Sequence, residues 1–193
     1  MGQASLLPAD TMERLRSLLA GRPRRACSDP SYRCAAVLVP LLQKEGEWHV
    51  LVTQRTNEVQ HHRGQISFPG GACDQEDADI LATALRETFE EIGVPPEQVQ
   101  VLGLLDDMWT SSHFAITPVV GVIPYPYSCL LNPAEVEEVI EVPLSFLRDP
   151  SNLRIEEVEF EGRQVELLFW DYGKYMIWGA TARILKGFLD LEG

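Results

Sequence analysis

Three glutamates that lie close together in the sequence, Glu87, Glu90 and Glu91, are the clearest candidates for a chemical site in this chain. On a helix with 100° between residues they fall within about 100° of one another, so their carboxylates share one face. Like charges at this spacing repel by about 0.2–0.5 kcal/mol per pair unless a cation compensates. Arg86 can pair with Glu90, four residues further on, which leaves the other two glutamates without a local partner. Hard carboxylate oxygens suit Mg²⁺ or Mn²⁺, which also bind phosphates, so the pattern indicates a phosphate-processing site.

A solvated acidic face is the alternative interpretation of three glutamates alone. The preceding segment favours a site, because Phe68-Pro69-Gly70-Gly71 leads into the helix and its glycines allow a close approach of the backbone. Arg86 is also placed to orient a carboxylate through its planar guanidinium.

The elements that must position these residues follow from the hydrophobic pattern. The chain has 193 residues, of which 45% are apolar, and we expect one domain over 1–193. Strands and helices are mixed without regular alternation, which favours an α+β fold with helices packed on a mixed sheet. The expected helices are one at 8–20, within an N-terminal extension (1–30), one from about 77 to 92, and a closing helix at 178–190. The second helix and the glycine-rich loop before it lie within 64–94. The expected strands are a hairpin of 34–42 and 48–55, a short strand at 65–68, and strands near 99–105, 114–123, 154–160 and 164–170.

Charge and composition exclude several classes of protein. The net charge is −13, with +3 over residues 1–63 and −16 over residues 64–193, so only the basic first third can meet an anion and nucleic acid is not expected as a partner. No apolar run approaches the length of a membrane helix and the first residues lack a secretion signal, so we expect a cytoplasmic protein. The four scattered cysteines, Cys27, Cys34, Cys73 and Cys129, are expected to be reduced.

The helix and its glycine loop resemble the Nudix hydrolase family, whose box reads G-x5-E-x7-R-E-U-x-E-E-x-G-U, with U a bulky apolar residue. Two departures are visible: Thr88 occupies a U position, and eight rather than seven residues separate Asp77 from Arg86. The role of the box's first acid is therefore not carried over to Asp77. The positions that match are Arg86-Glu87, Glu90-Glu91 and Gly93-Val94, with Gly70-Gly71 supplying the opening glycine.

A more specific resemblance is to the coenzyme A pyrophosphatase branch, which carries L-L-T-x-R-[SA]-x3-R-x3-G-x3-F-P-G-G just upstream of the box, a lengthened loop and then T-A-L-R-E. The pattern has an arginine where this chain has Gln60, and Arg63 or His61 is the candidate to supply the missing positive charge. Val52 and Thr56 also depart from the pattern. The segments that carry the likeness are Leu51–Thr56, Gly64–Gly71 and Thr83–Glu87.

The resemblance implies an α/β/α sandwich with a mixed sheet between helices, and an enzyme that uses Mg²⁺ or Mn²⁺. It implies cleavage of CoA or acyl-CoA into adenosine 3′,5′-bisphosphate and (acyl-)4′-phosphopantetheine. By motif position Glu87 and Glu91 are the principal metal ligands, and Glu90 is a further ligand or the partner of Arg86. Gly70 and Gly71 shape the loop beside the metal.

The remaining roles are also implied by the resemblance. Arg86 orients the glutamates, and Glu135 is the candidate general base, with a plain surface charge as the alternative. Arg55, His61 and Arg63 are candidates to bind the phosphates of the substrate, although His61 and its neighbour His62 can equally be an exposed pair without a function. The aromatic residues that could stack on adenine, but are more often core, are Trp109, Phe114, Trp170 and Trp178.

Other functions remain compatible with the sequence. A Nudix enzyme for ADP-ribose, NADH or a damaged nucleoside triphosphate is the nearest alternative. A non-catalytic Nudix-fold binding module is expected to have lost the metal glutamates, whereas this chain retains all three. An acidic interaction protein whose helix merely resembles the box predicts no thermal shift with metal. The chain is expected to act as a monomer or a homodimer, with no membrane partner.

Overall fold

The computed structural model describes residues 8–56, 64–160 and 162–191. No helix in these ranges is long and apolar enough to cross a membrane. In chain order the elements are α1 (Pro8–Ala20), β1 (Arg33–Lys44), β2 (Glu47–Arg55), β3 (Ile66–Ser67), β4 (Gly70–Ala72), α2 (Ile80–Ile92), η1 (Pro96–Gln98), β5 (Gln100–Leu104), β6 (Met108–Trp109), β7 (Phe114–Val122), β8 (Val136–Pro143), α3 (Leu144–Arg148), η2 (Pro150–Asn152), β9 (Leu153–Phe160), β10 (Arg163–Tyr172), β11 (Tyr175–Trp178) and α4 (Gly179–Leu189).

Strand β1 lies at the centre of the main sheet, whose order is β3-β2-β1-β7-β5. It runs parallel to β7 and antiparallel to β2, and β4 pairs with its first half. Strand β8 lies beside β2, and β6 beside β7. One parallel pair among antiparallel pairs makes the sheet mixed, as the sequence predicts.

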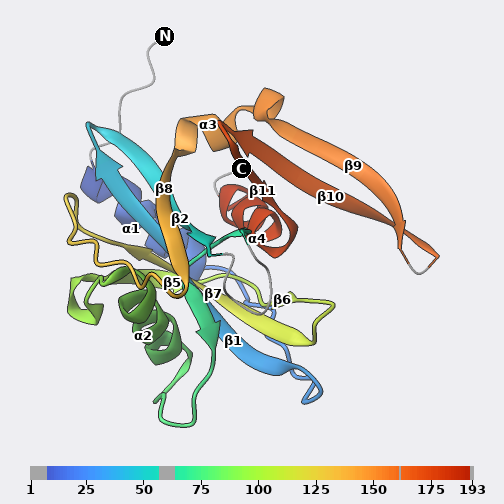
Figure 1. Cartoon of the computed structure of the whole chain (residues 1–193), viewed down its shortest axis with the longest axis horizontal. Helices are drawn as coiled ribbons and strands as arrows, with labels where there is room; N and C mark the ends of the chain where they lie inside the picture. Colours follow the sequence, from blue (N-terminus) through green and yellow to red (C-terminus); the bar gives the residue numbers. More distant parts are fainter. Residues whose placement is uncertain (1–7, 57–63, 161, 192–193) are drawn as a thin grey trace.

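Helices cover both faces of this sheet. Ala36, Leu38 and Leu42 of β1 pack in the core beneath α2, whereas Val39 and Leu41 pack in the core that α1 and α4 cover. A strand buried on both faces must be apolar at nearly every position, which explains the run from Ala35 to Leu42. Figure 1 shows α2 and α4 on opposite sides of the sheet. The α+β class and the sandwich of helices around a mixed sheet are therefore confirmed.

A second sheet, in the order β11-β10-β9, follows the main sheet in the sequence. Its β9–β10 hairpin projects away from the body of the protein (Figure 1). The base of this sheet joins the core through Trp170, which is 1% exposed and donates from its Nε1 to the Leu147 carbonyl. Trp170 is thus a core residue and cannot stack on a nucleobase.

Helix α2 begins later than the sequence suggests. Asp79 caps it, because its side chain accepts a hydrogen bond from the Ala82 backbone N–H at 2.9 Å, and the helix ends at Gly93 in the left-handed conformation. The predicted start at Asp77 is wrong, since that residue lies in the loop before the cap. The expected strands are otherwise found within a few residues of their predicted bounds.

The expectation that all four cysteines are reduced is wrong for two of them. Cys34 and Cys73 form a disulfide, with 5.4 Å between their Cα atoms, while Cys27 and Cys129 are free. The two bonded cysteines are 39 residues apart in sequence and become neighbours because β4 pairs with β1. Cysteine spacing carries no signal of such a long-range pairing.

The basic first third of the chain is largely neutralised within the fold. Arg22 and Arg25 bind the carboxylate of Asp106 at 2.6 and 2.9 Å, and Arg24 binds Asp107. These ion pairs tie the segment after α1 to the loop between β5 and β6. The arginines of this segment are therefore engaged by carboxylates of the same chain rather than held ready for a substrate anion.

The disulfide should contribute measurably to stability. Replacing Cys73 by Ser, or reducing the wild type, should lower the free energy of unfolding by about 2–4 kcal/mol, because the unfolded chain regains the entropy of a closed loop. Urea denaturation followed by circular dichroism measures this difference. Cys129→Ser, which changes an exposed free cysteine, is the matched control and should leave stability unchanged. Equal stability of the oxidised and reduced wild type would contradict the prediction.

Candidate functional site

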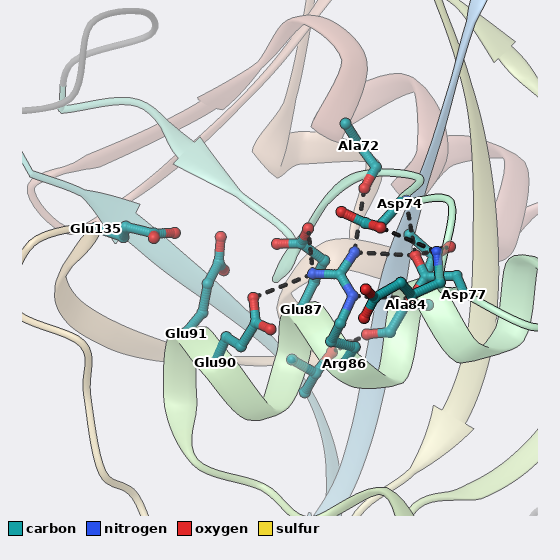
Figure 2. A network of polar contacts seen from close by, with 12 residues as sticks. Ala72, Asp74, Asp77, Ala84, Arg86, Glu87, Glu90, Glu91 and Glu135 are labelled. Carbon is teal, nitrogen blue, oxygen red and sulfur yellow. Dashed lines mark hydrogen bonds and ion pairs between the residues drawn. The ribbon is translucent and has the colours of Figure 1, made fainter.

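Arg86 organises carboxylates from α2 and from the loop that precedes it (Figure 2). Its Nε and one terminal nitrogen donate to both oxygens of Asp77 at 2.9 and 3.0 Å. The other terminal nitrogen donates to Glu87 at 2.9 Å and to Glu90 at 3.1 Å, and the Ala72 carbonyl accepts a further bond at 3.2 Å. A guanidinium has five N–H donors, so these bonds use all of them. Arg86 thus has no donor left for a substrate, which agrees with an orienting role.

Asp77 is the residue of this network whose role the sequence left unassigned. The Arg86 guanidinium holds the pKa of this carboxyl well below its usual range, and the Thr83 hydroxyl donates to it at 2.8 Å. The hydrogen bonding between Asp77 and Arg86 in turn raises the pKa of Arg86 further above its ordinary value. The signal was present in the sequence as an acidic residue near the box's first acidic position. The lengthened loop obscured it.

Glu91 has a different environment from the other two glutamates of α2. It is 2% exposed, its carboxylate accepts a hydrogen bond from the Gly70 backbone N–H, and the Arg55 guanidinium lies 3.7 Å away. Its Oε2 is buried and has no hydrogen-bond partner in the described part of the chain. Burial raises the pKa of Glu91 to about 8, and the nearby charges of Glu135 and Glu87 act in the same direction.

Glu87 lies between these two environments. Its side chain is 16% exposed and bonds to Arg86, yet burial still raises its pKa above the ordinary value. Glu90 is the outermost of the three, with a side chain 50% exposed. The three carboxylates thus run from solvent to the protein interior along one face of α2, as the helical spacing predicts.

The two positions Gly70 and Gly71 of β4 require glycine, because neighbouring atoms come too close to leave room for a side chain. A Cβ on Gly71 would come within 2.5 Å of the Glu87 carboxyl carbon. A Cβ on Gly70, whose φ is +154°, would come within 2.3 Å of the Ala36 carbonyl oxygen. Any side chain at either position would therefore displace the carboxylate or separate β4 from β1. Gly70 and Gly71 thus lie in strand β4 rather than in a loop, and their expected role beside a metal stays a prediction.

Glu135 reaches the same site from the segment before β8. The backbone N–H of Asn132 donates to the Glu91 carbonyl at 3.0 Å, and that of Leu130 donates to the Ile92 carbonyl at 3.1 Å. The Thr56 N–H donates to the Glu135 carbonyl at 3.0 Å, which fixes the segment beside the end of β2. In Figure 2 the Glu135 side chain points towards Glu91. Its negative charge raises the pKa of both Glu91 and Glu87.

The structure brings together most of the residues that the sequence selected. Arg55 lies at the end of β2 beside Glu91, and its Nε is buried without a hydrogen-bond partner among the described residues. Gln60, His61 and Arg63 lie outside the described residues. The sequence-selected residues that lie at one site are Arg55, Gly70, Gly71, Arg86, Glu87, Glu90, Glu91 and Glu135.

The aromatic candidates do not share this arrangement. The Cζ atom of the Arg33 guanidinium lies 4.7 Å from the centre of the Phe114 ring. Trp178 stacks on Phe169 and is 38% exposed, and Trp109 of β6 is 44% exposed. Of the four candidates that the sequence named, Trp170 lies in the core, Phe114 is partly exposed beside Arg33, and Trp109 and Trp178 are the most exposed.

The donor set consists of hard oxygen ligands that are paired with arginines. Among the described residues no group of three or more acidic, histidine or cysteine side chains is already gathered as a metal cage. Glu87 and Glu90 instead bond to Arg86, and Glu91 faces Arg55. Carboxylates without a cation between them repel, so pairing with arginine is the expected arrangement of such a set. Within the described ranges, the Oε2 atom of Glu91 is the carboxylate oxygen that this arrangement leaves without a hydrogen-bond partner.

Comparison with known proteins decides the family. The family model described as NUDIX domain matches residues 32–167, which include β1, β4, α2 and Glu135. The chain belongs to the Nudix family. It is similar to the protein of Photorhabdus laumondii named uncharacterized Nudix hydrolase NudL, with 40% identity over 92% of this chain and 93% of that protein. A protein of the same name from Enterobacter sp. (strain 638) is 37% identical over 86% of this chain and 85% of that protein.

A solved structure supports the fold of this Nudix protein. The MutT/nudix family protein from Enterococcus faecalis superposes with a TM-score of 0.54 and covers 97% of this chain and 75% of that chain, at 16% identity. A likeness at this identity concerns the fold alone. It agrees with the mixed sheet flanked by helices described above.

The buried Glu91 predicts how stability depends on pH. In metal-free protein the folded state keeps this proton up to about pH 8, whereas the unfolded chain loses it near the ordinary value of 4.5. The stabilisation is therefore complete below about pH 4.5 and is lost as the pH rises through about 8. Between these values the wild type should lose up to about 1.4 kcal/mol of unfolding free energy per pH unit relative to Glu91→Gln.

Urea denaturation of both proteins in the presence of a chelator, at several values of pH from 5 to 9, measures this difference. Glu97→Gln, which changes an exposed glutamate of η1, is the control and should follow the wild type. A constant difference between wild type and Glu91→Gln across this range would show that Glu91 is ionised in the folded metal-free protein.

Proposed function

We propose that this Nudix protein is a metal-dependent pyrophosphohydrolase that cleaves CoA or acyl-CoA into adenosine 3′,5′-bisphosphate and (acyl-)4′-phosphopantetheine. The proposal rests on the environment of Glu91, whose buried side chain has one oxygen without a hydrogen-bond partner among the described residues and lies beside two further glutamates of α2. Leaving such an atom unpaired costs about 1–3 kcal/mol, and more for a charged group, which is difficult to explain for a purely structural residue.

A divalent cation fits the residues present. Glu87, Glu90 and Glu91 would hold it, since hard oxygen ligands suit Mg²⁺ and Mn²⁺. The cation would neutralise phosphate charge and lower the pKa of a water molecule. The raised pKa of Glu91 and Glu87 also agrees with this role, because their carboxylates are costly to ionise until a cation compensates them.

The chain's own residues divide the remaining work. Arg86 holds Glu87 and Glu90 in place through its fixed geometry and does not contact the substrate. Glu135, which points into the site from another element, is the proposed acceptor of the proton from the attacking water. Water attacks phosphorus, the bond to the bridging oxygen breaks, and the two products each leave with a terminal phosphate.

Two features support CoA as the substrate. The upstream segment 51–71 keeps the spacing of the CoA pyrophosphatase pattern, and its Arg55 lies at the site with a buried Nε that has no partner among the described residues. An unsatisfied guanidinium donor beside the glutamates suits a phosphate oxygen. We propose that Arg55 binds substrate phosphate, together with Arg63 and His61 of the same segment.

Product analysis tests both the reaction and the substrate. CoA, acetyl-CoA, 3′-dephospho-CoA, ADP-ribose and NADH are each incubated with Mg²⁺ or Mn²⁺, and the products are separated by chromatography. We expect adenosine 3′,5′-bisphosphate from CoA, with a higher kcat/KM than for any compound that lacks the 3′-phosphate. Glu91→Gln should lower kcat/KM at least about 100-fold, since charge stabilisation by a metal is worth several kcal/mol.

The controls separate the two parts of the proposal. Glu97→Gln removes an exposed carboxylate of η1 that is not among the proposed metal or substrate ligands, and it should retain activity. Faster cleavage of ADP-ribose or NADH would leave a Nudix pyrophosphohydrolase but contradict the CoA assignment, and would mean that Gln60 marks a change of specificity. Absence of metal-dependent cleavage for every compound would favour a binding module.

Asp77 provides a test of the orienting role of Arg86. Asp77→Asn removes the charge that receives two of the five guanidinium bonds, so Arg86 should hold Glu87 and Glu90 less firmly. Loss of such outer support typically costs about 10–100-fold in metal affinity, and we expect about 10-fold weaker binding of Mn²⁺. Electron paramagnetic resonance of free Mn²⁺ measures the affinity. Asp74→Asn, whose carboxylate bonds to a loop N–H and not to Arg86, should bind as the wild type.

A further inference from the structure

We propose that Cys34 and Cys73 form a reversible thiol–disulfide site that sets the affinity of the α2 glutamates for a divalent cation. The inference rests on the proposed metal role of these glutamates but is independent of the substrate. It concerns a covalent bond between β1 and β4 that the proposed hydrolysis does not use.

The disulfide lies directly beside the strand that supports the glutamates. Cys73 follows Ala72, whose carbonyl accepts a hydrogen bond from Arg86 at 3.2 Å (Figure 2). In the same strand the Gly70 N–H donates to Glu91, and Gly71 lies against the Glu87 carboxylate. Each of the three residues of β4 therefore contacts either a glutamate or the arginine that orients them.

The disulfide also anchors the loop on the other side of Cys73. This loop leads to Asp77, which receives two bonds from Arg86, and then to Asp79, which caps α2. The position of Arg86 is thus fixed by two acceptors, Ala72 and Asp77, that lie one and four residues from Cys73 along the chain.

The link is placed where the ladder between β1 and β4 ends. Ala35 pairs with Ala72, and beyond this pair the Cys73 N–H donates to the Cys34 carbonyl at 3.1 Å. The end of a short ladder opens locally at a small free-energy cost unless it is tied. Cleavage of the disulfide should therefore loosen the Ala72 carbonyl and the loop that carries Asp77, while the paired glycines of β4 stay in place.

The bond is accessible to thiol chemistry. Cys34 is exposed and Cys73 is half-buried. A thiolate of a small dithiol attacks one sulfur of the Cys34–Cys73 bond, which breaks, and the other cysteine leaves as a thiolate. The second thiolate of the reductant then attacks the reductant's own sulfur in the mixed disulfide, so the remaining cysteine also leaves as a thiolate. The protein gains two thiols, and the reductant leaves as its own disulfide after giving up two electrons and two protons.

The experiment compares Mn²⁺ binding to the oxidised and reduced wild type by electron paramagnetic resonance. Complete removal of outer support costs about 10–100-fold in metal affinity, and reduction leaves every residue in place, so we expect roughly 3–10-fold weaker binding after reduction. Reoxidation with a disulfide of a small thiol should restore the affinity. Cys34→Ser and Cys73→Ser should behave as the reduced protein under both conditions, whereas Cys129→Ser should respond as the wild type.

A second readout needs no metal. Amide hydrogen exchange of the metal-free protein should become faster over residues 72–79 on reduction, and stay unchanged in the middle of α2. Equal Mn²⁺ affinity in the two redox states would overturn the inference even if stability differs. Failure of both forms to bind Mn²⁺ would instead contradict the metal role in the proposed function, and the inference would fall with it.

Discussion

The arrangement of the site depends on one guanidinium that holds together carboxylates which would otherwise repel one another. Arg86 donates to Asp77, Glu87 and Glu90 at 2.9–3.1 Å and uses its last donor on the Ala72 carbonyl. In a chain of net charge −13 this cation allows a helix face, a loop and a strand to converge. Because its pKa is raised even above the ordinary value of an arginine, this positive charge is permanent.

Glu91 shows what the rest of the fold adds to this local arrangement. The sheet buries it beside β4, and the only cation near it is Arg55, 3.7 Å away, among the residues the structure describes. Such burial is unfavourable for folding and favourable for binding a cation, because the same carboxylate that resists ionisation alone is stabilised by a positive charge. The fold thus holds the Glu91 carboxylate with its negative charge only partly compensated by a nearby cation, which is typical of functional sites.

Much of the fold and of the candidate site could be predicted from the sequence. The features that could not be predicted depend on loop length or on long-range contacts. The shared face of Glu87, Glu90 and Glu91 follows from helical spacing, and the packed strand at 34–42 follows from its apolar run. The partnership of Asp77 with Arg86 could not be assigned, because a lengthened loop changes its spacing from the helix. The Cys34–Cys73 bond depends on the pairing of β4 with β1, a long-range contact that local patterns do not encode. No strand is predicted at 136–143, yet β8 forms there because β2 offers it a partner.

Binding of a divalent cation by the α2 glutamates is tested most directly with a crystal of the oxidised wild type grown with Mn²⁺. Diffraction is measured near the manganese absorption edge, where the metal alone gives strong anomalous scattering. We expect a peak within coordination distance of Glu87 or Glu90 and of the Glu91 Oε2 that has no partner in the described chain. A peak confined to other carboxylates, or density showing Glu91 still paired only with Arg55 at saturating Mn²⁺, would contradict it.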